Sequence, residues 1–113
     1  MKSILIVDDE FEITDILRWL FEWNDFKVHT AANGKEALAI LVNQQIDILI
    51  IDVMMPIMDG IELARIIRAD ESLRHIPIIM MSAAPVEAAE QYSDYLFQKP
   101  FLFQDLLAQV KAL

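Results

Sequence analysis

Five short apolar segments, rich in β-branched residues, recur along the chain and predict β-strands. They are Ser3–Val7, Phe26–Thr30, Ile46–Ile51, Ile76–Met81 and Tyr95–Gln98. The first, third and fourth are nearly continuous apolar runs, which is typical of strands that are buried on both faces of a parallel sheet. The pattern therefore predicts a largely buried five-stranded sheet.

The segments between these strands repeat apolar residues at helical spacing. The predicted helices are Phe11–Trp23, Gly34–Val42, Ile61–Arg68 and Phe103–Leu113. In the first helix, the expected core-facing stripe consists of Ile13, Ile16, Leu17 and Leu20. Strands and helices that alternate at these lengths predict an α/β fold, a doubly wound three-layer sandwich with a (βα)5 repeat and helices on both faces of a parallel sheet.

The composition narrows the class of protein. The chain has 113 residues, of which 56% are hydrophobic, so we expect one compact domain over residues 1–113. No cysteine is present, which excludes disulfides and thiolate metal ligands. The net charge of −9 and the scattered basic residues argue against direct nucleic-acid binding. Neither a signal peptide nor a membrane-length apolar run is visible, so the expected location is the cytoplasm and no membrane partner is expected.

Chemically capable side chains follow four of the predicted strands. Asp8 and Asp9 end the first strand, Asp52 follows the third, Ser82 ends the fourth, and Lys99 follows the fifth. Ligands of open parallel sheets bind beyond these strand ends, where the strand order reverses. If the strand order is 2-1-3-4-5, the first and third strands meet there. Each residue alone could be a helix cap or a turn residue, but their joint placement indicates a site.

Three clustered carboxylates repel one another unless a cation lies between them. Mg²⁺ suits such a set because it binds oxygen ligands, often one or two carboxylates together with a phosphate. We interpret His29 and His75 as structural residues, which disfavours zinc or iron. A carboxylate in this setting can attack phosphorus and form an aspartyl phosphate. Asp52 is the expected nucleophile because its strand is central.

Several stretches of the chain, taken in order, resemble the receiver domains of two-component response regulators. They are Ile4–Glu10, Ala32–Leu38, Asp47–Gly60, Ile76–Ala83 and Lys99–Phe101. The resemblance extends in order along nearly the whole chain, and the joint motif is far more specific than any one piece. The resemblance implies a flavodoxin-like fold with the sheet order 2-1-3-4-5, and phosphorelay signalling.

The resemblance also implies a role for each acidic residue. Asp52 would be the phosphoacceptor. Asp9 would be a direct Mg²⁺ ligand, and Asp8 would lie nearby and hold metal-bound waters. The backbone carbonyl of Met54 would complete the protein ligands of the Mg²⁺ cofactor.

Ser82 resembles the hydroxyl that moves to bind the phosphoryl group. Lys99 resembles the lysine that pairs with a phosphoryl oxygen, and the resemblance implies a cis bond between it and Pro100. The phosphoryl donor would be a histidine kinase or a histidine phosphotransfer protein, while the downstream protein target stays unknown.

The chain departs from the family between Ser82 and Lys99, which are 17 positions apart, about five fewer than is usual. We therefore expect a remodelled or mobile segment at 83–93, with room for at most two helical turns. At the readout position, where the family often has an aromatic residue, stands Leu96, with Tyr95 and Phe97 beside it.

Trp19 and Trp23, spaced i and i+4, lie off the expected core stripe of the first helix. They either cover the margin of the core or form a patch for a partner or for self-association, in a chain that is a monomer or a weak dimer. Met54 and Ala84 stand where side chains influence dephosphorylation in the family. Neither side chain can hydrogen-bond an attacking water.

The leading hypothesis is a phosphorylation-controlled signalling module that is not an enzyme beyond its own phosphorylation and dephosphorylation. One alternative is a binding module that acts without phosphorylation. A less favoured one is a Mg²⁺-dependent aspartyl-phosphate phosphatase, which would need a lid that this sequence does not provide. No output region follows Leu113, so we expect the output to be another protein or part of a longer parent chain.

Overall fold

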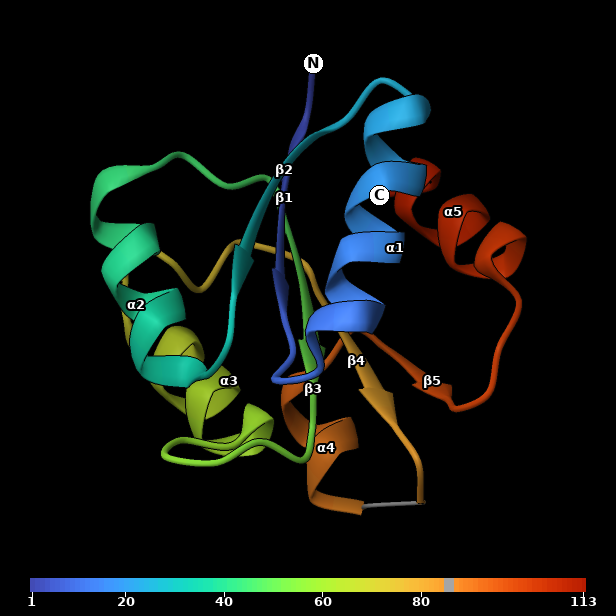
Figure 1. Cartoon of the computed structure of the whole chain (residues 1–113). Coiled ribbons are helices and arrows are strands. Elements are labelled where there is room, and N and C mark those ends of the chain that lie inside the picture. The colour runs from blue at the N-terminus through green and yellow to red at the C-terminus, as the bar shows by residue number, and fades with distance from the viewer. Residues whose placement is uncertain (85–86) are drawn as a thin grey trace.

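A computed structural model describes residues 1–84 and 87–113 of the chain (Figure 1). The described residues form alternating strands and helices. In chain order these are β1 Ser3–Val7, α1 Phe11–Trp23, β2 Lys27–Ala31, α2 Gly34–Asn43, β3 Ile48–Asp52, α3 Gly60–Ala69, β4 Ile78–Ser82, α4 Glu87–Tyr92, β5 Tyr95–Gln98 and α5 Phe103–Lys111.

The strands form one parallel sheet in the order β2-β1-β3-β4-β5, as predicted. Helices α1 and α5 cover one face of the sheet, and α2, α3 and α4 cover the other (Figure 1). The predicted doubly wound three-layer sandwich is therefore confirmed. β1 and β3 are neighbours at the centre of the sheet, so their carboxyl ends meet at the position where the strand order reverses.

Successive residues of the central strands pack on opposite faces of the sheet. In β1, Leu5 and Val7 join the core beneath α2 and α3, whereas Ile4 and Ile6 join the core beneath α1 and α5. All four side chains are fully buried. Each such side chain contributes about 1.5–3 kcal/mol through burial, which explains why these strands are continuous apolar runs.

The face of α1 that packs on the sheet differs from the predicted stripe. Its buried residues are Thr14, Leu17 and Phe21, while Ile16 is 59% exposed. The Phe21 ring packs edge-on against Phe103 of α5, with ring centroids 4.9 Å apart. The prediction was right for Leu17, which is buried, and for Ile13, which packs against the core, but it was wrong for Ile16. Burial of the large Phe21 ring, four residues after Leu17, turns the helix so that Ile16 faces away from the core.

Side-chain caps fix the beginning of two helices. The side chain of Asn33 accepts the amide of Glu36 at the start of α2, and that of Asp59 accepts the amide of Glu62 at the start of α3. β2, β3 and β4 begin one or two residues later than predicted and end one residue later. Asp52 and Ser82 are therefore the last residues of their strands.

The shortened region after Ser82 contains α4, a helix of six residues, in agreement with the expected limit of two turns. Only Ala89 of this helix is buried. Part of the predicted remodelled or mobile segment at 83–93, namely Pro85 and Val86, lies outside the described residues. The mobility of the segment stays a prediction.

Candidate functional site

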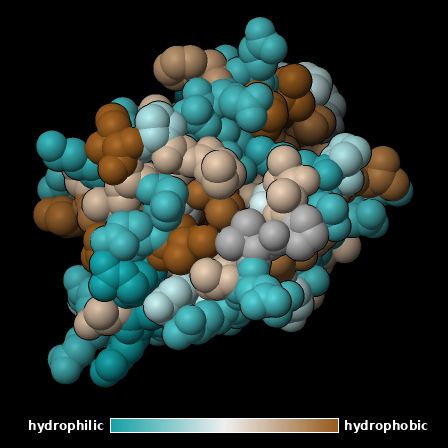
Figure 2. Space-filling view, turned by 90° about the horizontal axis from the view of Figure 1, so that it is seen from below, coloured by the Kyte–Doolittle hydropathy of each residue, from teal (hydrophilic) through white to brown (hydrophobic). Residues whose placement is uncertain are grey.

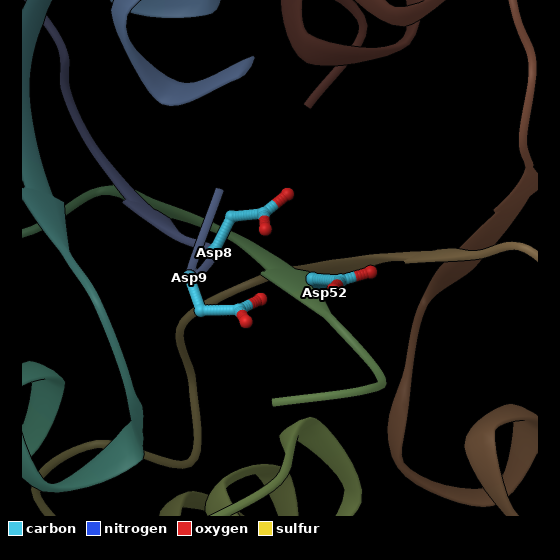
Figure 3. A group of neighbouring side chains, drawn as sticks. All are labelled: Asp8, Asp9 and Asp52. Atoms are coloured by element: carbon cyan, nitrogen blue, oxygen red, sulfur yellow. The ribbon is translucent and has the colours of Figure 1, made fainter. Parts of the chain in front are cut away.

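Three carboxylates meet at the carboxyl ends of β1 and β3. Ligand oxygens of Asp8, Asp9 and Asp52 all lie within 4.8 Å of one another, and Figure 3 shows the three side chains side by side. Asp8 and Asp52 are buried, whereas Asp9 is exposed. The cluster follows from the sheet register, because Val7 pairs with Ile51 and the residues that follow emerge together.

The backbone around Asp52 is closely packed against the start of α3. A Cβ atom on Gly60 would lie 2.3 Å from the carbonyl oxygen of Asp52, so the helix can approach this closely only with glycine. The amide of Gly60 also donates to the carbonyl of Val53 at 2.9 Å. The first residue of α3 is thus in direct contact with the backbone of the candidate phosphoacceptor.

Lys99 extends from the end of β5 into the acidic cluster. Its Nζ lies 3.1 Å from Oδ1 of Asp52 and 3.5 Å from Oδ2 of Asp8. The Lys99 amide donates to the carbonyl of Ser82 at 2.8 Å, which holds the ends of β4 and β5 together. The peptide bond between Lys99 and Pro100 is cis, as the resemblance implied.

Ser82 is buried at the end of β4. Its hydroxyl donates to the carbonyl of Ala84 and accepts the amide of the same residue at 3.2 Å. The hydroxyl is therefore bonded to the backbone immediately after its own strand.

Burial and mutual repulsion set the protonation behaviour of the cluster. Burial and the neighbouring charge of Asp8 raise the pKa of the Asp52 carboxyl to about 6, although the hydrogen bond from Lys99 opposes the rise. Burial also raises the pKa of Asp8. Burial lowers the pKa of Lys99, but the hydrogen bond to Asp52 and the charges of both carboxylates outweigh it, so this pKa lies above its usual range.

The donor set fits a hard divalent cation. Oδ2 of Asp8 is buried and has no hydrogen-bond partner among the described residues, and Lys99 approaches it only at ion-pair distance. Uncompensated carboxylate oxygens are costly to bury unless a cation offsets their charge. Oxygen-only ligands around that position match the preference of Mg²⁺, so the acidic cluster is consistent with a Mg²⁺ site.

The predicted readout residues lie on both faces of β5. Leu96 packs against the core beneath α3 and α4, and Phe97 packs on the opposite face, with its ring centroid 5.5 Å from that of Phe101. Tyr95 is exposed at the start of the strand. These positions connect the strand that carries Lys99 to both helical layers.

The two tryptophans of α1 lie on the surface. Trp19 is 63% exposed and Trp23 is 76% exposed, and their ring centroids are 5.8 Å apart. Exposure of this size favours the surface-patch interpretation over one in which the rings cover the core margin.

Sequence reasoning missed a groove beside Lys99. It has a volume of about 590 Å³ and lies between α1 and the connection from β5 to α5, where it is lined mainly by apolar side chains. Ile13, Ile16 and Leu20 line this groove. The helical periodicity marked these residues as apolar, but it could not show whether a neighbouring element covers them.

Comparison with known proteins identifies the family. The family model described as "response regulator receiver domain" matches residues 4–111, and the chain belongs to this family. The acidic pocket is of the kind typical of phosphoaspartate two-component signalling. Receiver domains act with histidine kinases as their partners. They do not form a classical enzyme family.

Among curated proteins, the chain is 37% identical over its whole length to the transcriptional regulatory protein CpxR homolog of Haemophilus influenzae. It is 36% identical, over 98% of its length, to the phosphate regulon transcriptional regulatory protein PhoB of Pseudomonas aeruginosa. The chain covers 50% and 51% of these two proteins, so it spans about half the length of the curated relatives that it matches.

Solved structures agree with this assignment. The signal receiver domain of a histidine kinase from Syntrophus aciditrophicus superposes with a TM-score of 0.94 at 29% identity, covering 99% of this chain and 89% of that one. The response regulator TrrA from Thermotoga maritima, solved in complex with Mg²⁺-BeF, gives a TM-score of 0.89 at 32% identity, covering 99% and 98%. None of the helices formed by the described residues is long and apolar enough to cross a membrane.

Proposed function

We propose that Asp52 accepts a phosphoryl group from a phosphohistidine donor, with Mg²⁺ as cofactor, and that the modified chain changes conformation to control a partner protein. The observation that carries this proposal is the approach of Lys99 to Asp52 at 3.1 Å within a cluster of three carboxylates. The candidate nucleophile Asp52 therefore lies beside both a cationic side chain, Lys99, and the other carboxylates of the cluster.

Three groups would bind the metal directly, namely the carboxylates of Asp9 and Asp52 and the backbone carbonyl of Met54, while the carboxylate of Asp8 would hold metal-bound waters. Mg²⁺, when bound, supplies positive charge to phosphoryl oxygens and lowers the repulsion between the carboxylates. The Mg²⁺-BeF complex of the related TrrA protein supports this choice of cofactor.

The transfer step requires little from the protein beyond a positioned nucleophile. A carboxylate oxygen of Asp52 attacks phosphorus, a new P–O bond forms, and the P–N bond of the phosphohistidine breaks with its electron pair returning to the imidazole. With a pKa of about 6, Asp52 is mostly deprotonated at neutral pH and can act as the nucleophile. Lys99 pairs with a phosphoryl oxygen and stabilises its charge.

Ser82 connects the modification to the fold. Its hydroxyl is bonded to the carbonyl of Ala84, and a phosphoryl oxygen on Asp52 offers it a charged and therefore stronger acceptor. Movement of the hydroxyl would be read out at Leu96, with Tyr95 and Phe97 beside it. Reversal needs water, and neither Met54 nor Ala84 has a side chain that can orient a water molecule.

The donor would be a histidine kinase or a histidine phosphotransfer protein, and the target would be another protein rather than nucleic acid. The face at the carboxyl ends of the strands mixes hydrophobic and hydrophilic residues (Figure 2), which is compatible with a protein partner because protein interfaces are, as a whole, about as apolar as the rest of a protein surface. The basic residues form no stripe along the chain that would follow a phosphate backbone. The cytoplasm stays the expected location.

Incubation with Mg²⁺ and acetyl phosphate, followed by intact-mass measurement and tests of acid and base stability, distinguishes the candidate functions. We expect a single phosphoryl adduct with the base lability of an acyl phosphate. A wild-type chain that never labels would favour a phosphorylation-independent binding module. Rapid multiple turnover of small phosphate esters would favour a phosphatase.

A further inference from the structure

Arg68, near the end of α3, makes a set of long-range hydrogen bonds outside the phosphorylation site. Its guanidinium donates to three backbone carbonyls, at 3.0 Å to Tyr92, 2.8 Å to Arg74 and 3.0 Å to Ile76. It also donates to the carboxylate of Asp94 at 2.8 Å. The side chain is only 25% exposed, so these bonds are partly shielded from water.

These bonds hold together segments that are distant in the sequence. Tyr92 ends α4, Asp94 forms the turn between α4 and β5, and Arg74 and Ile76 belong to the connection from α3 to β4. The same Oδ2 atom of Asp94 that binds Arg68 also accepts the amide of Ile78, the first residue of β4, at 2.8 Å. Arg68 therefore fixes the α4–β5 turn on the end of α3.

The opposite end of α3 contacts the phosphoacceptor. Gly60, the first residue of the helix, lies against the carbonyl oxygen of Asp52 and donates its amide to Val53. Helix α3 has 10 residues, and a helix of this length is about 15 Å long. It is one rigid element with the Asp52 backbone at one end and the α4–β5 turn at the other.

The shortness of α4 makes this attachment important. An isolated helix of six residues is not stable in water, because too few hydrogen bonds offset the cost of nucleation. Its one buried residue, Ala89, contributes little apolar area. The guanidinium at its carboxyl end supplies a cation where the helix dipole favours one.

We propose that Arg68 is a positioning residue that couples phosphorylation of Asp52 to the α4–β5 turn through α3. This inference rests on the proposed function and adds a connection that bypasses Ser82. Phosphorylation restrains the loop between Asp52 and Gly60, α3 follows as a rigid element, and Arg68 transmits the restraint to the turn.

The hydrogen bonds of the Arg68 guanidinium can be tested by conservative substitution. The guanidinium uses four of its five N–H donors in a fixed planar fork, and a lysine ammonium cannot reproduce that geometry. Arg68→Lys keeps the positive charge but loses the planar set of N–H donors, and Arg68→Gln loses both the charge and that set of donors. Arg65, one turn earlier, is 55% exposed and bonds to Glu62 within the same helix, so Arg65→Gln is the matched control.

The measurement is residue-level amide hydrogen exchange with and without acetyl phosphate and Mg²⁺, alongside the mass of the adduct. The reporters are the Ile78 amide, which donates to the Asp94 carboxylate, and the Asp94 amide, which donates to the Ile78 carbonyl at 2.8 Å. In wild type and in Arg65→Gln, we expect phosphorylation to slow exchange at both amides at least threefold. In Arg68→Gln and Arg68→Lys we expect that change to disappear, while the initial rate of Asp52 labelling stays within twofold.

Each other outcome has a definite meaning. If the wild-type chain does not label, the proposed function fails and the coupling fails with it. If wild type labels but the two amides do not respond, or if they respond equally in Arg68→Gln, the proposed function survives and the coupling is wrong. Asp94→Asn, which keeps an acceptor for the Ile78 amide and removes the charge that faces Arg68, provides a second test should Arg68→Gln fail to fold, and it should also weaken the response.

Discussion

Nζ of Lys99 lies 3.1 Å from Oδ1 of Asp52, and both side chains are largely buried at the carboxyl edge of the sheet. An ion pair at this distance normally lowers the pKa of the carboxyl group. Here burial and the charge of Asp8 outweigh Lys99, and the pKa of Asp52 rises from 3.8 to about 6. Ionised Asp52 therefore lowers the free energy of unfolding of the chain.

That cost predicts how stability depends on pH without a divalent cation. The folded-state pKa exceeds the unfolded value, so the folded chain binds more protons between pH 3.8 and about 6, and the free energy of unfolding falls as the pH rises through this window. Asp52→Asn removes the penalty. At pH 7.5 in chelator we expect this variant to be more stable than wild type by about 1–3 kcal/mol in denaturant unfolding.

The difference should shrink towards zero near pH 4, where the wild-type carboxyl is already protonated in the folded state. A wild-type chain that is the more stable of the two at pH 7.5 would show that Lys99, rather than burial, dominates the site.

Mg²⁺ should stabilise the fold, because a cation that binds only the folded state adds its binding free energy. At ten times its dissociation constant the gain is about 1.4 kcal/mol, seen as a rise in the unfolding midpoint. Asp9→Asn should lose most of this gain, because Asp9 contributes one of the three clustered carboxylates. Glu71→Gln, which removes an acidic residue outside the cluster, is the control and should respond as wild type does. An equal response in Asp9→Asn would remove Asp9 from the metal ligands.

The loop between Asp52 and α3 contains a strained residue. Ile57 has a φ of 70° at the centre of a tight turn in which the amide of Met58 donates to the carbonyl of Pro56 at 2.7 Å. A β-branched side chain at positive φ costs about 1–2 kcal/mol, and Ile57 is 78% exposed, so its side chain recovers little of this through burial. Ile57→Asn should therefore stabilise the chain by about 0.5–1 kcal/mol in thermal or denaturant unfolding.

Val42→Asn is the matched control, since Val42 is also β-branched and exposed but lies within α2. It should give no stabilisation. A destabilised Ile57→Asn chain would mean that the Ile57 side chain contributes contacts that outweigh the strain.

The exposed Trp19 and Trp23 rings should matter for association and not for folding. We expect the double substitution Trp19→Glu, Trp23→Glu to change the free energy of unfolding by less than about 1 kcal/mol. Phosphotransfer from a histidine kinase or self-association measured by sedimentation should weaken, while labelling by acetyl phosphate stays unchanged. If partner transfer and oligomeric state are both unaffected, the patch is not an interface.

The strand ends and the acidic cluster could be predicted from the sequence because both depend on local patterns. The apolar runs fixed the central strands, and the polar residues directly after them had to meet at one edge of a parallel sheet. The cis bond before Pro100 and the acidic roles came from the resemblance, and the cis bond is confirmed.

Features that depend on long-range packing were not predictable. The burial of Phe21 depends on the position of Phe103 on another helix, so the periodicity of α1 placed Ile16 on the core face and left Phe21 off it. The long-range hydrogen bonds of Arg68 leave no local pattern in the sequence, because their acceptors are 6 to 26 residues away and three of them are backbone carbonyls. The contact between Gly60 and Asp52 could not be predicted either, because a glycine at this position is equally expected at the beginning of any helix.

The central claim is that Asp52 is the phosphoacceptor, and peptide mapping of the labelled chain tests it most directly. After brief incubation with Mg²⁺ and acetyl phosphate, tandem mass spectrometry should place a single phosphoryl group on the peptide that contains Asp52. The adduct should be absent from Asp52→Asn and should form more slowly in Lys99→Gln, which lacks the cation beside the reacting oxygen. A label of equal yield in Asp52→Asn, or one that maps to Asp8, Asp9 or Ser82, would contradict the account.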